Sequence, residues 1–206
     1  MKLYFVRHGE SEANTLRVIS NRESQYGLTT LGKQQALTLA DRLKDIPITA
    51  IFSSPILRAR ETSEILSQSF NLPYQITEAL REYDCGILEE KSDEASWKLH
   101  GEIAADWTLN NNHARKPEGG ENYLEIKKRF LPFIESFTQN GLHAEDRILL
   151  VSHGGLLQLM LPEILTDIDY AFVRSHGIRH TQCIIVEQTP AGLLCLQWGN
   201  VKLYDM

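Results

Sequence analysis

Three short apolar runs divide the chain, and each ends abruptly in polar residues. They cover Leu3 to Val6, Ile48 to Phe52 and Ile148 to Val151. Continuous apolar runs of this length, bounded by turn-forming residues, are typical of strands that are buried on both faces. We therefore expect these runs to be strands of one buried sheet.

Helical spacing of apolar residues dominates between these runs. Thr29 suits the N-cap of a first helix, and Ser54 with Pro55 is expected to begin a second. A third helix follows Gly120, and Pro132 should kink or shorten it. The apolar stripes are Leu31, Ala36, Leu39, Ala40 and Leu43 in the first helix, and Tyr123, Ile126, Phe130, Phe133 and Phe137 in the third. Strands that alternate with helices predict an α/β fold.

The chain of 206 residues fits one ordinary α/β domain, since it has no internal repeat and no interdomain linker. Two further apolar runs, 183–186 and 193–197, flank a Thr-Pro-Ala-Gly turn and predict a closing β-hairpin. Residues 87–119 are the least regular part, with helical fragments expected at 94–99 and 103–109. We expect a single domain over residues 1–206, with a lid-like insertion at about 87–119.

Residues capable of chemistry follow all three predicted strands. Arg7 and His8 follow the first, Arg58 lies in the helical turn after the second, and His153 follows the third. Ligands of α/β sheets collect beyond the carboxyl ends of the strands, where a helix N-terminus adds partial positive charge. An isolated Arg-His-Gly triplet is more often a salt-bridged turn. Two arginines and two histidines together instead suit a phosphoryl group, with one imidazole attacking and guanidinium groups holding oxygens.

Other candidates are weaker. Asn14, six residues beyond His8, is either an amide donor to a bound anion or a solvated turn residue. An acid near a phosphate pocket would be pushed towards its protonated form, as a leaving-group acid requires, and Glu78, Glu82 and Asp84 all qualify. Candidates for substrate contact in the insertion, for each of which a surface or packing role is favoured, are Trp97, Trp107, His113, Arg115 and Lys116.

The net charge of -6 and the absence of a dense Lys/Arg block argue against a nucleic-acid partner. Three widely spaced cysteines form no disulfide framework and fit a reducing cytoplasm. No run reaches transmembrane length, so no membrane partner is expected, and the first strand leaves no room for a cleavable leader. His176 and His180 have the spacing of a metal pair, but no third ligand lies nearby, so no metal site is expected.

Taken together, these motifs resemble the histidine phosphatase superfamily, also called the phosphoglycerate mutase-like family. The resemblance implies a three-layer α/β/α sandwich around a mixed, mostly parallel sheet. It covers nearly the whole chain in the family's order and rests on Val6 to Ser11 with Asn14, Leu28-Thr29 with Gly32 and Gln35-Ala36, Ser53 to Pro55 with Arg58-Ala59 and Glu61-Thr62, Leu80, Glu82 and Gly86, Pro117 to Glu121, and Val151 to Gly155.

The resemblance also implies a mechanism. His8 would be the nucleophile that forms a phosphohistidine, and Glu82, among the three acids above, would be the proton donor. Residues implied to bind the phosphoryl group and substrate are Arg7, Asn14, Arg58, His153 and Gly154. We therefore expect a metal-independent phosphomonoesterase without a cofactor, which acts on a small phosphorylated metabolite. A homodimer is one assembly compatible with the family.

Two alternatives are a cofactor-dependent phosphoglycerate mutase and a non-catalytic phosphate-binding regulatory module. The complete set of a nucleophile and an acid argues against the module. Family mutases carry an Arg directly after the catalytic Glu and a Tyr two residues further on, whereas this chain has Tyr83 and Cys85 at those positions. This difference and the short insertion favour hydrolysis, although Arg115 and Lys116 could supply basic charge.

Overall fold

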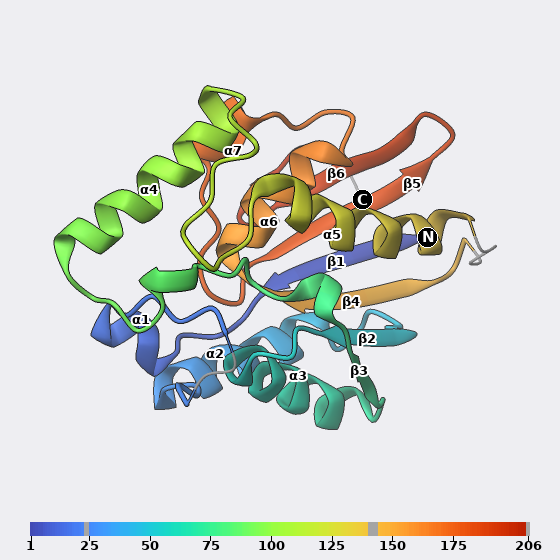
Figure 1. Cartoon of the computed structure of the whole chain (residues 1–206). Helices are drawn as coiled ribbons and strands as arrows, with labels where there is room; N and C mark the ends of the chain where they lie inside the picture. Colours follow the sequence, from blue (N-terminus) through green and yellow to red (C-terminus); the bar gives the residue numbers. More distant parts are fainter. Residues whose placement is uncertain (23–24, 140–143, 205–206) are drawn as a thin grey trace.

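The computed structural model describes residues 1–22, 25–139 and 144–204, and within them the centre is a seven-stranded mixed sheet (Figure 1). The spatial order is β3-β2-β4-β1-β5-β6-β7. The first four strands of this order pair in parallel, and β5, β6 and β7 continue the sheet in antiparallel pairs. The strands are β1 (Lys2–Arg7), β2 (Ala50–Ser53), β3 (Tyr74–Ile76), β4 (Arg147–Ser152), β5 (Cys183–Thr189), β6 (Gly192–Trp198) and β7 (Val201–Lys202).

The central strands are apolar on both faces, which is why both faces must be covered. In β1, Leu3 and Phe5 point into one core cluster, and Tyr4 and Val6 point into the other. A parallel strand buried on both faces reads as a continuous apolar run, so the sequence pattern of β1 follows from its place in the sheet.

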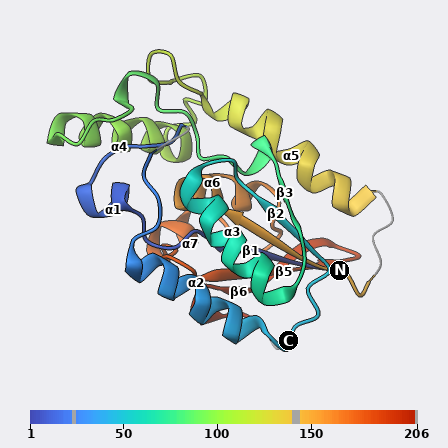
Figure 2. The same ribbon diagram turned by 90° about the horizontal axis from the view of Figure 1, so that it is seen from below.

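Helices cover both faces of the sheet (Figures 1 and 2). α2 and α3 pack on the face of Tyr4 and Val6, whereas α5 and α6 share a core with Leu3 and Phe5. The three-layer sandwich expected from the sequence is confirmed. The helices are α1 (Glu12–Leu16), α2 (Thr30–Leu43), α3 (Leu57–Phe70), α4 (Glu94–Leu109), α5 (Tyr123–Gln139), α6 (Gly154–Met160) and α7 (Tyr170–Ser175), with short 3₁₀ turns η1 (Glu78–Leu80), η2 (Gly86–Leu88) and η3 (Leu161–Glu163).

Several predicted details differ from the structure. α4 is one helix through residues 94–109, not two fragments, because its N-cap Asp93 accepts from the Ser96 amide and nothing inside breaks it. Pro132 lies inside α5 without ending it, since Phe130 and Ile134 on either side are fully buried. Leu31 is exposed, because it lies on the outer side of α2.

The end of β2 also differs from prediction. The second strand begins at Ala50 instead of Ile48, because Ile48 donates its amide to Ile46 across Pro47 and the backbone is bent there. α3 begins at Leu57, with Ile56 as its N-cap, so Ser54 does not cap it. Arg58 nevertheless lies in the first turn of α3, as predicted.

Two glycines hold the loop after β1 against the start of α2. A Cβ on Gly9 would lie 2.5 Å from the carbonyl oxygen of Gly32, and a Cβ on Gly32 would lie 2.0 Å from the carbonyl oxygen of Glu10. The Gly9 amide donates to Thr62 Oγ1 of α3 at 3.1 Å. Because only glycine permits this backbone contact, the loop that carries His8 is fixed between two helices.

Candidate active site

His8 lies just beyond the carboxyl end of β1 and is 2% exposed. Its Nδ1 lies 2.6 Å from the carbonyl oxygen of Gly9, and its Nε2 lies 3.0 Å from Nε of Arg58. A carbonyl can only accept and a guanidinium can only donate. Nδ1 therefore carries the proton and Nε2 presents its lone pair. The Gly9 carbonyl therefore fixes the tautomer of His8.

Both predicted arginines lie at this edge of the sheet. Arg58 is 4% exposed and donates from Nη1 to the carbonyl of Ser20 at 2.7 Å, while Arg7 donates from Nη1 to the carbonyl of Ile178 at 2.7 Å. Burial lowers the pKa of Arg58 to about 10, so its guanidinium stays charged at neutral pH. Burial and then the charges of Arg58 and Arg7 hold the pKa of His8 well below its ordinary value. His8 is therefore a neutral imidazole flanked by two cations.

His153 is the second histidine brought to this edge. Its ring centroid lies 5.0 Å from that of His8, and its Nε2 lies 2.7 Å from Ser54 Oγ. Ser54 Oγ also accepts from the Ile56 amide. The Nδ1 of His153 is buried and has no partner among the described residues.

Glu82 follows η1 and is 7% exposed. One carboxylate oxygen accepts from the Gly155 amide at 2.9 Å, and the other accepts from the Tyr83 amide at 3.2 Å. Burial raises the pKa of Glu82, and the Arg58 charge opposes this only in part. A Cβ on Gly155 would lie 2.8 Å from the Glu82 carboxylate oxygens, so glycine is needed beside the acid. Glu82 is thus the acid, of the three considered, that is both buried and close to the histidines.

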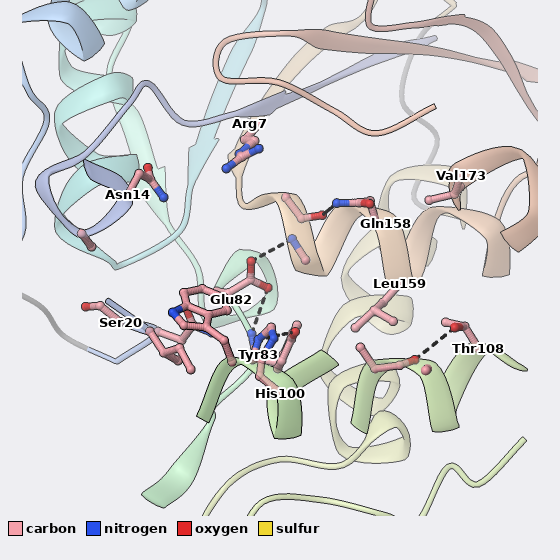
Figure 3. A pocket seen from close by; sticks show the side chains of 18 of the residues that line it. Arg7, Asn14, Ser20, Glu82, Tyr83, His100, Thr108, Gln158, Leu159 and Val173 are labelled. Carbon is pink, nitrogen blue, oxygen red and sulfur yellow. Dashed lines mark hydrogen bonds between the residues drawn. The ribbon is translucent and has the colours of Figure 1, made fainter. Parts of the chain in front are cut away.

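A cavity of about 490 Å³ opens over these groups (Figure 3). Arg7, His8, Arg58, Glu82 and Gly154 all line it. The α-carbon of Gly154 packs against Arg7, since a Cβ there would lie 3.2 Å from Arg7 Nε. These five predicted residues therefore converge on one cavity from four separate segments of the chain, and His153 lies behind them with its ring beside that of His8.

Asn14 and Trp97 also line the cavity. The Oδ1 of Asn14 accepts from the amide and hydroxyl of Ser11, and its NH₂ group makes no hydrogen bond within the described part of the chain. Asn14 thus helps to cap α1, and its NH₂ group faces no partner among the described residues in the cavity that it lines. Trp97 lies on α4, and its indole Nε1 donates to the Arg17 carbonyl at 2.7 Å.

The other predicted contacts in the insertion lie outside the cavity. Trp107 is buried against Tyr83, and His113 stacks on Tyr123. Arg115 pairs with Asp106 and Glu102, and Lys116 pairs with Glu125. These charges are held by acids near them in the sequence, so they do not supply basic charge to the cavity.

His180 was missed as a site residue. It lies in the loop before β5, and its ring centroid is 5.8 Å from that of His8. Its Nε2 is buried without a partner among the described residues, and burial next to Arg7 and Arg58 lowers its pKa to about 4. The spacing to His176 suggested only a metal pair. No periodic pattern places this loop, so the sequence held no signal for its approach to His8.

Buried polar atoms without partners cluster around His8. Among the described residues, five buried side-chain polar atoms lack a partner, and four belong to Arg7, Ser20, His153 and His180. Buried polar atoms without partners are rare in native proteins and often mark functional sites. Together with the two guanidinium groups beside a neutral histidine, they indicate a site suited to an oxygen-rich anion.

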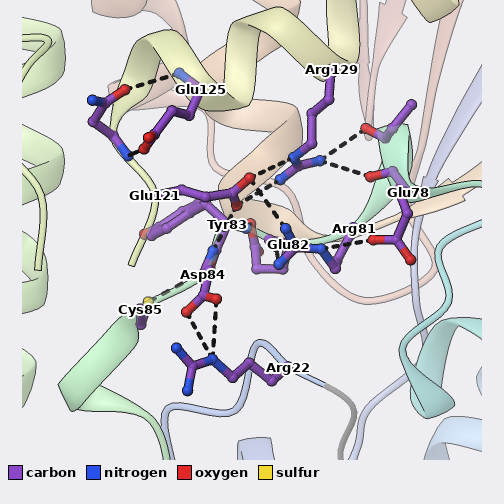
Figure 4. Close-up of polar contacts among 12 residues, drawn as sticks. Arg22, Glu78, Arg81, Glu82, Tyr83, Asp84, Cys85, Glu121, Glu125 and Arg129 are labelled. Atoms are coloured by element: carbon purple, nitrogen blue, oxygen red, sulfur yellow. Dashed lines mark hydrogen bonds and ion pairs between the residues drawn. The ribbon is translucent and has the colours of Figure 1, made fainter. Parts of the chain in front are cut away.

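An ion-pair network holds the segment that carries Glu82 (Figure 4). Arg129 of α5 donates to both carboxylate oxygens of Glu121 at 3.0 and 3.2 Å, and from Nη1 to the carbonyls of Glu78 and Ala79. Glu121 in turn accepts from the Asp84 amide at 2.9 Å. The backbone on both sides of Glu82 is therefore tied to α5.

Neither a metal cluster nor a membrane span is found in the described ranges. No group of three or more His, Cys, Asp or Glu side chains there is placed to hold a metal ion. Over the same residues, no helix is long and apolar enough to cross a bilayer. The three cysteines, Cys85, Cys183 and Cys195, are buried free thiols.

Known proteins resemble this chain along most of its length. The "Probable phosphoglycerate mutase GpmB" of Escherichia fergusonii is 33% identical over 165 residues, which are 80% of this chain and 75% of that protein. The structure of YhfR from Bacillus stearothermophilus matches with a TM-score of 0.81 and 27% identity over 98% of each chain. The mycobacterial glucosyl-3-phosphoglycerate phosphatase matches in fold, with a TM-score of 0.76 and 21% identity over 97% of this chain and 99% of that one.

A family model covers nearly the same span. It is described as the histidine phosphatase superfamily (branch 1), and it matches residues 3–201. The match includes every segment that lines the cavity. The chain is therefore a member of the histidine phosphatase superfamily, branch 1.

Proposed function

We propose that this protein is a phosphomonoesterase that works through a phosphohistidine on His8. The observation that carries the proposal is the fixed tautomer of His8, whose Nε2 is unprotonated and faces Arg58 in a buried, cationic site. An unprotonated imidazole nitrogen beside two guanidinium groups suits attack on a phosphoryl group.

In the first step, Nε2 of His8 bonds to phosphorus while the bond from phosphorus to the ester oxygen breaks. Arg7, Arg58, His153 and the NH₂ group of Asn14 neutralise and hold the equatorial oxygens. Glu82, whose raised pKa favours its protonated form, gives its proton to the departing alkoxide. In the second step, Glu82 takes a proton from water, the water oxygen bonds to phosphorus, and the phosphorus–Nε2 bond breaks to release phosphate.

Hydrolysis is favoured over mutase activity by the charges of the cavity. A phosphoglycerate mutase must hold a carboxylate and a second phosphate while its intermediate reorients. Among the described residues that line this cavity, the cations are Arg7, Arg58 and Arg174, and the first two belong to the phosphoryl site. Arg115 and Lys116 are paired with acids elsewhere. The mutase remains the second candidate, because the relative from Escherichia fergusonii bears that name.

The test follows both outcomes in one reaction. Purified protein is given 3-phosphoglycerate with 2,3-bisphosphoglycerate, and free phosphate and 2-phosphoglycerate are measured. We expect phosphate release, with p-nitrophenyl phosphate also hydrolysed. Conversion to 2-phosphoglycerate with negligible phosphate would establish the mutase instead. Rapid quench with a labelled phosphodonor should give an acid-labile adduct that His8→Ala abolishes, and no adduct at all would favour the binding module.

We further propose that no metal ion takes part, because arginines supply the charge that neutralises the phosphoryl oxygens. Activity on p-nitrophenyl phosphate should survive dialysis against a chelator. Loss of activity that a divalent ion restores would refute this. A cytoplasmic location, the absence of nucleic-acid and membrane partners, and the homodimer stay predictions.

A further inference from the structure

The cavity has two chemically different ends. The end near His8 is polar and charged, because Arg7, His8, Arg58 and Glu82 line it. The other end lies between α4, α6 and α7, with α4 along one side (Figure 3). The volume of about 490 Å³ is within the range of small-molecule sites, so there is room for a group beyond the phosphoryl site.

Apolar side chains line most of this far end. They come from α4, α6 and α7. These side chains are Ala104, Ala105, Leu109, Leu159 and Val173. Trp97 joins them with its one polar atom already used, because its indole N–H donates to the Arg17 carbonyl. The ring therefore offers carbon surface to the cavity.

The polar side chains at the far end already have partners within the protein. Thr108 donates to the carbonyl of Ala104, and Gln158 donates to the carbonyl of Gly154. Tyr170 donates to the carbonyl of Leu159, and the hydroxyl of Tyr83 pairs with Nε2 of His100 at 2.8 Å. The hydroxyl protons of Thr108 and Tyr170 are thus committed, so this end offers a substrate hydroxyl fewer partners than water does.

Charge is also scarce at this end. His100 is largely buried, and burial lowers its pKa, so its ring is neutral. Arg174 is exposed on α7 at the rim, and it makes no ion pair with a described residue. It is the one cation lining the far end in the described part of the chain.

From this asymmetry, and resting on the proposed phosphatase activity, we propose that the substrates are phosphomonoesters of apolar alcohols, with an alkyl or aryl group seated against α4. The phosphoryl group lies beside His8, Arg7 and Arg58 at one end of the cavity. The carbon chain displaces water from the apolar end. Phosphorylated sugars then fit less well, because their hydroxyl groups would lie against carbon surface. The one charged partner for a carboxylate at this end, among the described residues, is Arg174, which lies exposed at the rim.

The first experiment compares substrates with leaving groups of similar basicity. For ethyl, propyl, butyl and hexyl phosphate, kcat/KM should rise about threefold to fourfold per added methylene, the factor expected for burying one. Propyl phosphate should exceed glycerol 3-phosphate, which is the same chain with two added hydroxyls, and should also exceed 3-phosphoglycerate. A flat alkyl series, or a preference for glycerol 3-phosphate or 3-phosphoglycerate, would overturn the proposal, and the last would point to Arg174.

Substitutions in α4 test whether the alkyl chain lies against this helix. Ala105 lines the cavity, whereas Ala95 lies exposed on the same helix and does not. Ala105→Leu should fill the far end and lower the preference for hexyl over ethyl phosphate by about tenfold, the value of one or two buried methylenes. Ala95→Leu should leave this ratio unchanged. Equal ratios in both variants would place the alkyl chain elsewhere and contradict the proposal.

Failure of the proposed function is distinguishable from failure of this inference. If p-nitrophenyl phosphate is hydrolysed but the alkyl series is flat, only the substrate class is wrong. If no ester is hydrolysed and no phosphohistidine forms, the proposed function is wrong, and binding still tests the cavity. Alkylphosphonates, which cannot be hydrolysed, should bind more tightly with chain length by calorimetry, and Ala105→Leu should remove that trend. A Kd independent of chain length would overturn the inference without any turnover.

Discussion

Two hydrogen bonds decide which nitrogen of His8 can react. The Gly9 carbonyl accepts a hydrogen bond from the protonated Nδ1, and Arg58 on the neighbouring helix α3 donates to Nε2. The bond from Arg58 must be given up when Nε2 attacks, and the same N–H can then pass to a phosphoryl oxygen. Arg58 therefore aims the nucleophile in the resting site and neutralises charge afterwards.

Glu82 is the residue whose role is tested most directly by changing the leaving group. Glu82→Gln keeps the shape of the side chain and removes the proton donor. We expect kcat on an alkyl phosphate to fall by about 10²–10⁴-fold, the usual value of general acid–base catalysis. The fall on p-nitrophenyl phosphate should be much smaller, because its leaving group needs little protonation.

Steady-state kinetics on the two substrates measure this difference. Wild-type protein with each substrate is the reference, and circular dichroism checks the fold of the variant. Equal losses on both substrates would show that Glu82 acts on structure or binding and not as the acid.

At the scale of elements, α5 holds the acid without touching the cavity. The fork of Arg129 joins Glu121 to the carbonyls of η1, so the backbone around Glu82 depends on a helix on the far side of that segment. Arg129 and Glu121 are mostly buried, with side-chain exposures of 15% and 16%, so water screens their pairing only weakly.

Arg129→Gln should therefore displace the carboxyl group of Glu82 and slow its proton transfer. We expect kcat on an alkyl phosphate to fall about tenfold, with KM and the rate on p-nitrophenyl phosphate little changed, because small displacements of catalytic groups are costly. Arg129→Lys should recover part of the loss. Lys128→Gln, at the exposed neighbouring position of α5, is the matched control. Parallel losses on both substrates would mean that Arg129 stabilises the fold as a whole.

The elements predicted best are those with a clear pattern of apolar residues, either a continuous run or a helical repeat. β1 and β4 are apolar on both faces, so their runs, their ends and the residues just beyond them could be read directly. The approach of Glu82 to the site came only from the resemblance, because its segment has no regular spacing. Arg115 was a candidate for substrate contact, but the local spacing to Asp106 on α4 decides its partner. His180 depends on how a loop returns to β1, which no local pattern encodes.

At the scale of the whole molecule, three imidazoles that stay neutral when folded make the free energy of unfolding depend on pH. Burial, followed by the charge of nearby arginines, lowers the pKa of His8, His153 and His180, the last to about 4. Unfolded histidines take up protons near pH 6.5. Between that pH and the folded pKa values, the unfolded chain binds more protons, so stability falls as pH falls. Glu82 and Glu89, whose pKa values are raised by burial, oppose this trend.

The contribution of one histidine can be isolated by difference. Urea denaturation between pH 6.5 and 5 should show that His180→Asn weakens the loss of stability with falling pH, by up to about one proton in the linkage slope. The carboxylates are common to both proteins and cancel in the comparison. Identical slopes for wild type and variant would show that His180 is as easily protonated in the folded protein as in the unfolded chain.

The contact between Gly9 and Gly32 has a consequence for how this protein tolerates change. Neither glycine offers a side chain to a substrate, yet a methyl group on either would collide with backbone atoms 2.5 Å or less away. Backbone cannot rotate aside as a side chain can, so the collision would move the carbonyl that fixes the tautomer of His8. In a library of every single substitution selected for activity, position 32 should therefore be depleted as strongly as position 8.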